Sequence, residues 1–198
     1  GTDLMVTESK LIGVASIPDM YKQMFTDGRG FQVMQVGFKG AGYSSPEITV
    51  FDYNNLGELE SSTNETGLST TYTYDNFGRL TEENHPDRGL SKFTYDLAGN
   101  LLKTETPATG TTGITRTYFK GRLLTVEYPQ TGNLNDVTYT YGTKGDGKNG
   151  AGRIVKIEQG NGFKEDQYKY DLLGNVVYER KLIQVPTAGD RKFTTHFS

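Results

Sequence analysis

The sequence predicts an all-β fold, an antiparallel meander of repeated β-hairpins that forms a wide, twisted or curled sheet. The first observation is a recurring unit, Tyr-Asp-x-x-Gly-x-Leu, which is complete at residues 74–80 and 95–101. Near copies occupy residues 53–59 and 170–176, and altered copies begin at Tyr118 and Tyr141. A period of about 20–50 residues indicates a repeat architecture. The second observation is a hydrophobic content of 34 % with 13 Tyr and 10 Phe, which favours a thin, aromatic buried layer.

Composition excludes several classes of function. The net charge is −3 and Lys and Arg are scattered, so we expect no nucleic-acid partner and no anionic membrane surface as a partner. The chain has no cysteine, which excludes disulfides and thiolate metal sites. It has no apolar run of about 18 residues, so this segment is not expected to insert into a membrane.

The first part of the chain, residues 1–46, does not fit the repeat and is expected to pack on the sheet. Residues 11–15 predict a short strand. Residues 16–25 predict one short helix, because Ser16 is an N-cap candidate and Pro18 and Asp19 follow in the first turn. Residues 27–30 then break the helix, and residues 31–38 predict a strand.

Residues 47–198 predict about six repeats, each consisting of one hairpin and one connecting turn. Tyr72 and Tyr74 lie on one face of a strand, and residues 75–78 form a four-residue turn. Asp75 accepts backbone N–H groups two residues on, and Gly78 takes the positive φ of a type I turn with a bulge. The same turn roles are expected for Asp96, Gly99, Asp171 and Gly174.

The end of the chain continues the same pattern. Connections are expected at residues 107–113, 129–136 and 160–163, for a total of about twelve to fourteen strands. Residues 193–198 match the first strand of a further unit, so the last repeat is truncated and we expect the chain to be part of a longer array. Its edge strands should then be exposed and prone to strand-to-strand association.

The unit Tyr74-Asp75-x-x-Gly78-Arg79-Leu80 resembles the RHS/YD-repeat family, and residues 95–101 and 170–176 match it with Asn in place of Arg. The first unit departs further, with Asn54 for Asp and Glu58 for Arg. The resemblance implies a strip of antiparallel hairpins that spirals, in long members, into a hollow shell. Such shells enclose a C-terminal cargo in bacterial toxin complexes, and related repeats occur in large cell-surface proteins, including animal teneurins. Carbohydrate binding is a further implication. Six units are too few to close a shell, and the Asp-Pro self-cleavage motif of toxin-type arrays is absent from this sequence.

Four motifs suggest chemistry, and each has a simpler structural interpretation. Residues 142–149 spell a phosphate-loop pattern with Asn149 in the Ser/Thr position, but a strand is expected after them in place of the required helix. Asp146 and Asn149 lack the spacing of a calcium loop. His85 and His196 are too few for a zinc site or a catalytic triad, and the repeated aspartates already have turn roles. We therefore predict no catalytic residue, no metal and no cofactor.

The tyrosines are the remaining candidates. They form an aromatic ladder across the repeats, in which stacking rings supply the apolar face of a Leu-poor sheet. Exposed ladders of this kind also stack on sugar rings. The structural interpretation is favoured, and the candidate binding residues are Tyr72, Tyr74, Tyr139, Tyr141, Tyr168 and Tyr170.

Two functional hypotheses follow. The first is a non-catalytic structural and interaction module of a secreted or cell-surface protein, located outside the cell, whose partners are its own flanking domains and a glycan or a protein. The alternative is a piece of a toxin-delivery shell that encloses a C-terminal polypeptide cargo. An enzyme would need convergent polar groups in a pocket, which the spacing does not predict.

Overall fold

The computed structural model describes residues 5–11, 20–39, 46–129, 132–160, 162–184 and 191–196. Within these ranges the protein consists of sixteen strands and contains no helix, which confirms the all-β prediction. The strands are β1 (Met5–Leu11), β2 (Met20–Thr26), β3 (Gln32–Lys39), β4 (Pro46–Tyr53), β5 (Leu59–Asn64), β6 (Ser69–Tyr74), β7 (Leu80–His85), β8 (Gly89–Tyr95), β9 (Leu101–Glu105), β10 (Ile114–Phe119), β11 (Arg122–Glu127), β12 (Val137–Tyr141), β13 (Ile154–Gln159), β14 (Lys164–Tyr170), β15 (Val176–Ile183) and β16 (Arg191–His196).

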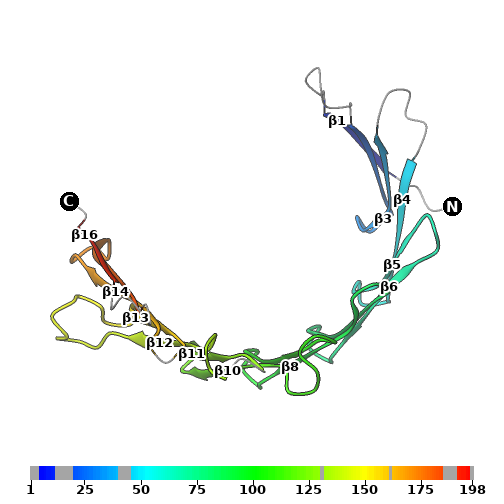
Figure 1. Ribbon diagram of the computed structural model, residues 1–198. Coiled ribbons are helices and arrows are strands. Elements are labelled where there is room, and N and C mark those ends of the chain that lie inside the picture. The colour runs from blue at the N-terminus through cyan, green and yellow to red at the C-terminus, as the bar shows by residue number, and fades with distance from the viewer. Residues whose placement is uncertain are drawn as a thin grey trace. The chain divides into compact units, whose positions relative to one another are not determined.

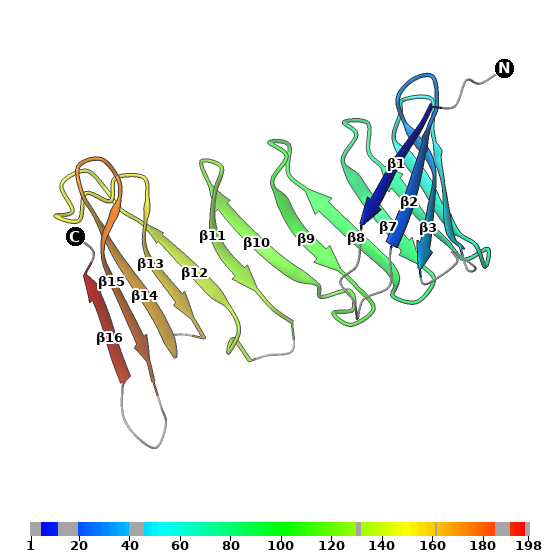
Figure 2. The same cartoon turned by 90° about the horizontal axis from the view of Figure 1, so that it is seen from above.

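The strand order in the sheet follows the order along the chain, from β1 to β16. The protein divides into two compact units, residues 1–92 and residues 93–198. Within each unit the strands lie side by side in one layer (Figure 1), and successive strands run in opposite directions (Figure 2). The predicted antiparallel meander is therefore confirmed.

The predicted helix at residues 16–25 is wrong, because Met20–Thr26 forms strand β2. All seven residues of β2 pair with β1 on one side and with β3 on the other. This pairing on both sides satisfies the backbone N–H and C=O groups of β2. A short helix would satisfy such groups internally but is only marginally stable in water. Residues 12–19, which include the N-cap candidate, lie outside the described residues, and the boundary at residue 46 stays a prediction.

The buried layer is thin. Among the described apolar side chains, the buried ones are Val36, Val126 and Val155, with exposed fractions of 8 %, 8 % and 5 %. Thr70, with an exposed fraction of 7 %, is the buried polar residue in the described ranges. Each hairpin is thus stabilised chiefly by its strand pairing and by side chains of the neighbouring hairpin, as in other repeat proteins.

Candidate functional site

The four-residue turns begin with an aspartate whose side chain organises the loop. The backbone N–H of Asp75 donates to the Arg79 carbonyl at 2.9 Å, and the N–H of Gly78 donates to the Asp75 carbonyl at 3.0 Å. Asp75 Oδ1 accepts the N–H groups of Phe77 and Arg79 at 2.9 and 3.1 Å, and Oδ2 accepts Arg79 Nε at 2.7 Å. The register shifts between Thr73 and Tyr74, next to this turn, as in a hairpin with a bulge.

The turns at Asp96 and Asp171 have the same geometry, with Asn in place of the arginine. Asn100 Nδ2 donates to Asp96 Oδ2 at 2.8 Å, and Asn175 Nδ2 donates to Asp171 Oδ2 at 2.8 Å. Gly78, Gly99 and Gly174 have φ values of 74°, 88° and 94°, the left-handed region that favours glycine. These residues therefore occupy turn positions at the ends of hairpins.

The hydrogen bonds lower the pKa of each turn aspartate. The Arg79 side chain, and then backbone N–H groups, hold the pKa of Asp75 below its usual value, while the side-chain amides of Asn100 and Asn175 have the leading effect on the pKa of Asp96 and Asp171. A carboxylate whose folded pKa is lowered stabilises the fold above its unfolded pKa of about 4. That stability is lost as the pH falls through the folded pKa.

This leads to a prediction about acid. Between about pH 5 and about pH 2 the urea midpoint of the protein should fall, and Asp75→Asn should show a smaller fall. The substitution is compatible with the turn, because Asn54 Oδ1 accepts the N–H groups of Leu56 and Glu58 at 2.9 Å each. Parallel urea titrations of the two proteins across this range provide the measurement. Identical pH dependence would show that the Asp75 carboxylate has no stabilising role.

Four of the repeat tyrosines connect their hairpin to the one before it. Tyr53 Oη donates to the Gln32 carbonyl at 3.0 Å, Tyr118 Oη to the Leu101 carbonyl at 3.1 Å, and Tyr141 Oη to the Leu123 carbonyl at 3.0 Å. Tyr170 Oη donates to the carbonyl of Ile154 in the same way. Each acceptor is the first or second residue of the second strand of the preceding hairpin, so every bond crosses from one repeat to the next.

At three of these junctions the residue after the turn glycine of the preceding hairpin completes the contact. Phe31 stacks on Tyr53 with ring centroids 5.0 Å apart, and the guanidinium carbons of Arg122 and Arg153 lie 5.5 and 5.6 Å from the ring centroids of Tyr141 and Tyr170. We call this set the inter-repeat seam: the repeat tyrosine, the glycine of its turn, and the residue after the turn glycine of the preceding hairpin.

The turn glycines belong to the seam because they leave space for that residue. A Cβ on Gly57 would lie 2.6 Å from Phe31 Cζ, and a Cβ on Gly78 would lie 3.1 Å from Glu58 Oε1. At Gly99 a Cβ would meet nothing within 4 Å. Glycine is therefore required at all of these turns because the backbone φ is positive. Packing also requires it where a seam residue of the preceding hairpin lies close, as Phe31 does at Gly57.

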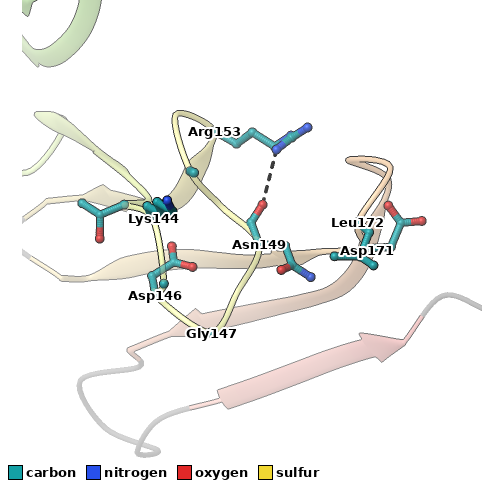
Figure 3. Close-up of a pocket in the computed structure, with 10 residues that line it drawn as sticks. Lys144, Asp146, Gly147, Asn149, Arg153, Asp171 and Leu172 are labelled. Atoms are coloured by element: carbon teal, nitrogen blue, oxygen red, sulfur yellow. Dashed lines mark hydrogen bonds between the residues drawn. The ribbon is translucent and has the colours of Figure 1, made fainter.

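A groove of about 430 Å³ lies between the inserted loop at residues 142–153 and the turn after β14. Lys144, Asp146 and Asn149 line it from the loop, and Asp171 and Leu172 line it from the turn (Figure 3). Two hydrogen bonds to the backbone of Tyr170 attach the loop to the next hairpin. The N–H of Tyr170 donates to the Lys148 carbonyl at 2.9 Å, and Asn149 Nδ2 donates to the Tyr170 carbonyl at 3.0 Å.

The phosphate-loop pattern in this insertion has no phosphate-loop structure. Strand β13 follows the loop, so no helix N-terminus points at the groove. Asp146 Oδ1 accepts the N–H groups of Lys148 and Gly150 at 2.8 and 3.4 Å, which is the turn-forming role of aspartate. In the described part of the chain, no group of three or more His, Asp or Glu side chains is arranged to hold a metal ion.

The two histidines take part in local contacts. His85 Nδ1 accepts the backbone N–H groups of Asp87 and Arg88 at 3.1 and 3.3 Å, inside the turn between β7 and β8. The ring of His196 meets Tyr178 edge to face, with centroids 5.2 Å apart. Each histidine thus lies in its own strand or turn.

Comparison with known proteins identifies the repeat. Residues 53–90 match the RHS Repeat family. The chain carries an RHS repeat. The match covers the units that begin at Tyr53 and Tyr74, and it confirms the resemblance that the tyrosine motif indicated. No curated protein matches the chain.

Solved structures of Tc toxins have the same fold as this chain. The crystal structure of TcdB2–TccC3–Cdc42 matches with a TM-score of 0.63 and 18 % identity, over 90 % of this chain and 9 % of that chain. The Tc holotoxin pore of Photorhabdus luminescens matches with a TM-score of 0.64 and 20 % identity, over 86 % of this chain and 9 % of that chain. The chain therefore spans about a tenth of the length of these proteins and has the same fold over that part.

The tyrosine ladder of the RHS repeats is half-buried. Residues 72 and 74, 139 and 141, and 168 and 170 each occupy alternate positions of one strand, and all six side chains are of intermediate exposure. Burial raises the pKa of Tyr74, Tyr168 and Tyr170. Tyr141 and Tyr170 already use their hydroxyls in the inter-repeat seam, so at these two positions a glycan would meet ring faces and edges rather than free hydroxyls.

Two features were missed when the sequence was examined alone. The turns at residues 27–30 and 64–67 have the hydrogen bonding of the RHS-repeat turn, although no tyrosine precedes either. Their Asx-x-x-Gly spacing was visible and could have identified them. The seam residues Arg122 and Arg153 occupy the arginine position of the motif, whereas Phe31 does not, so the motif alone does not indicate that this position contacts the next tyrosine. Among the described residues, no helix is long and apolar enough to cross a bilayer.

Proposed function

We propose that this RHS-repeat chain is a wall segment of a longer exported protein that encloses a polypeptide cargo. The observation that carries the proposal is the match to Tc toxin structures over 86–90 % of this chain and only 9 % of theirs. A non-catalytic role and a location outside the cell are parts of the same proposal. The flanking regions of the longer protein are its expected partners.

The side-chain chemistry supports a wall. Tyrosine hydroxyls and turn aspartates, the groups most often repeated, donate to or accept from the backbone of their own or the neighbouring hairpin. Strand pairing and the inter-repeat seam together make a continuous sheet one layer thick within each unit. Such a sheet separates two volumes with little protein mass, which suits a container.

Limited proteolysis of the intact longer protein tests this function. A C-terminal polypeptide should resist protease while the repeats are folded and should become sensitive at the denaturant concentration that unfolds them. The same polypeptide made without the repeats is the control, and it should be cleaved at once. If it is cleaved equally fast in both proteins, the repeats do not enclose it.

A surface module that binds a glycan or a protein is the second candidate. One observation favours it, a hollow of about 340 Å³ lined in part by Phe119, Leu124, Tyr139 and Tyr141. Aromatic rings at the edge of such a hollow present flat apolar faces to a sugar ring. Absence of a protected cargo in the proteolysis experiment would favour this candidate.

A further inference from the structure

Asn149 joins the inserted loop at residues 142–153 to the hairpin that follows it. Its Nδ2 donates to the Tyr170 carbonyl at 3.0 Å, and the carbonyl of the preceding residue, Lys148, accepts the N–H of Tyr170 at 2.9 Å. The Asn149 side chain points from the loop toward the turn after β14 (Figure 3). The loop and the hairpin both belong to the unit at residues 93–198, and Tyr170 obtains two backbone hydrogen bonds from the loop.

The fold restricts both residues of the Asn149-Gly150 pair. Asn149 has a φ of 50°, in the left-handed region that asparagine adopts more readily than most residues with a side chain. Gly150 is buried, and a Cβ there would collide with Cγ1 of Val155 and would lie 2.9 Å from Asp146 Oδ2. Asparagine suits the first position through its φ and its Nδ2 donor, and the second position has no space for a side chain. The fold therefore favours an asparagine directly before a glycine.

Asparagine directly before glycine is the pair most susceptible to deamidation. In this reaction hydroxide removes the proton of the glycine amide, and the glycine nitrogen attacks Cγ of the asparagine to form a succinimide ring. The side-chain nitrogen takes up a proton from water and leaves as ammonia. Water then opens the ring at one of its two carbonyls, which leaves aspartate or isoaspartate. Glycine favours the attack because it has no side chain to hinder the approach of its nitrogen.

The native contacts oppose this reaction while the loop is attached. Asn149 Nδ2 is held by the Tyr170 carbonyl, and the N–H of the buried Gly150 donates to Asp146 Oδ1 at 3.4 Å. Before the ring closes, the Asn149 side chain must turn to the Gly150 nitrogen and hydroxide must reach that nitrogen. We therefore expect the reaction in molecules whose loop has detached from the hairpin by local opening.

We propose that Asn149 is a deamidation site, and that its conversion makes detachment of the inserted loop permanent. A carboxylate at position 149 has no proton to donate at neutral pH, and its oxygens repel the Tyr170 carbonyl oxygen, which is also an acceptor. An isoaspartate adds one carbon atom to the backbone directly before the tightly packed Gly150. The loop then stays detached and Tyr170 loses both hydrogen bonds. This goes beyond the proposed function, because it concerns the ageing of the folded chain and not what the chain encloses.

Peptide mapping of the folded chain, aged at mildly alkaline pH, is the first test. After peptic digestion at low pH, where deamidation is slow, the peptide that contains Asn149 should show the mass gained when NH₂ is replaced by OH. Conversion should accelerate with pH and in urea that unfolds the chain. Asn100, which precedes Leu101, is the internal reference and should convert far more slowly. The second Asn-Gly pair of the sequence, at residues 161–162, is followed in its own peptide. Conversion of Asn149 in urea but not in the folded chain would overturn the proposal.

Amide hydrogen exchange followed by NMR measures whether conversion releases the loop. Asn149→Asp reproduces one of the two products. The N–H of Tyr170 should exchange about tenfold faster in this variant than in the parent, because it loses its hydrogen bond to the Lys148 carbonyl. The N–H of Asp171 donates to the Asn175 carbonyl at 2.9 Å within its own turn, and its exchange rate should not change.

Asn135→Asp is the matched control, because it adds the same charge in another exposed loop and should leave exchange at Tyr170 as in the parent. Equal exchange at Tyr170 in the two variants would overturn the proposal, and so would equal acceleration at Tyr170 and Asp171. If Asn149→Asp is unfolded by circular dichroism, fresh and aged parent protein are compared instead. Asn149→Gly, which has no amide to lose, is the control for ageing. Exchange at Tyr170 that does not change with age in the parent, or that rises equally in Asn149→Gly, would also overturn the proposal.

Discussion

Replacing Gly57 by alanine is expected to destabilise the protein by about 2–5 kcal/mol. The new Cβ would require alanine to adopt a φ of 84° and would lie 2.6 Å from Phe31 Cζ. Left-handed backbone costs about 1–2 kcal/mol for a residue with a Cβ, and overpacking costs about 1–3 kcal/mol more. Urea titration followed by circular dichroism measures the free energy of unfolding.

Gly99 provides the matched control for this prediction. Its φ of 88° is nearly the same, but a Cβ there meets nothing within 4 Å, so Gly99→Ala should cost only about 1–2 kcal/mol. A double-mutant cycle adds a second control: in a Phe31→Ala background, Gly57→Ala should cost no more than Gly99→Ala. Equal effects of Gly57→Ala in both backgrounds would mean that Phe31 and Gly57 do not interact.

Replacing Tyr141 by alanine is expected to lower the free energy of unfolding by about 2–4 kcal/mol, because it removes a half-buried ring and the hydrogen bond to the Leu123 carbonyl. Tyr141→Phe keeps the ring under the Arg122 guanidinium and should cost about 0.5–1.5 kcal/mol. The difference between the two variants separates the contribution of the ring from that of the hydroxyl.

Tyr139 lies two residues earlier on the same strand and is the control for the hydroxyl. Within the described residues its Oη makes no hydrogen bond, so Tyr139→Phe should change stability by less than about 0.5 kcal/mol. Denaturation midpoints of the three variants measured together provide the comparison. If Tyr141→Phe is as neutral as Tyr139→Phe, the seam hydrogen bond does not stabilise the fold.

The turns could be predicted from sequence because their determinants lie within five residues. Asp75 and Gly78 specify the loop through hydrogen bonds and φ values that involve no distant residue. Residues 16–25 favour a helix because Ser16 fits a helical N-cap, whereas the strand conformation of Met20–Thr26 depends on pairing with β1 and β3. The partner strand β3 follows the next turn, so the local residue pattern of β2 does not indicate this pairing.

The inter-repeat seam could be predicted only in part, for a related reason. The regular tyrosines indicated a structural ladder, but their acceptors are carbonyl groups, which every residue has. Identifying Gln32 or Leu123 as acceptor requires the register between two hairpins, which pairs β3 with β4 and β11 with β12 and which the spacing of the tyrosines does not specify.

The thin buried layer has a consequence for how such chains change over generations. Side chains of one hairpin are stabilised by those of the next, and no central core limits the number of hairpins. A gene duplication or deletion that adds or removes one whole hairpin with its connecting turn would recreate the same junction on both sides. The length of such a chain can therefore change in steps of about one repeat. The insertion or deletion of a few residues within a strand would shift the strand register and would be selected against.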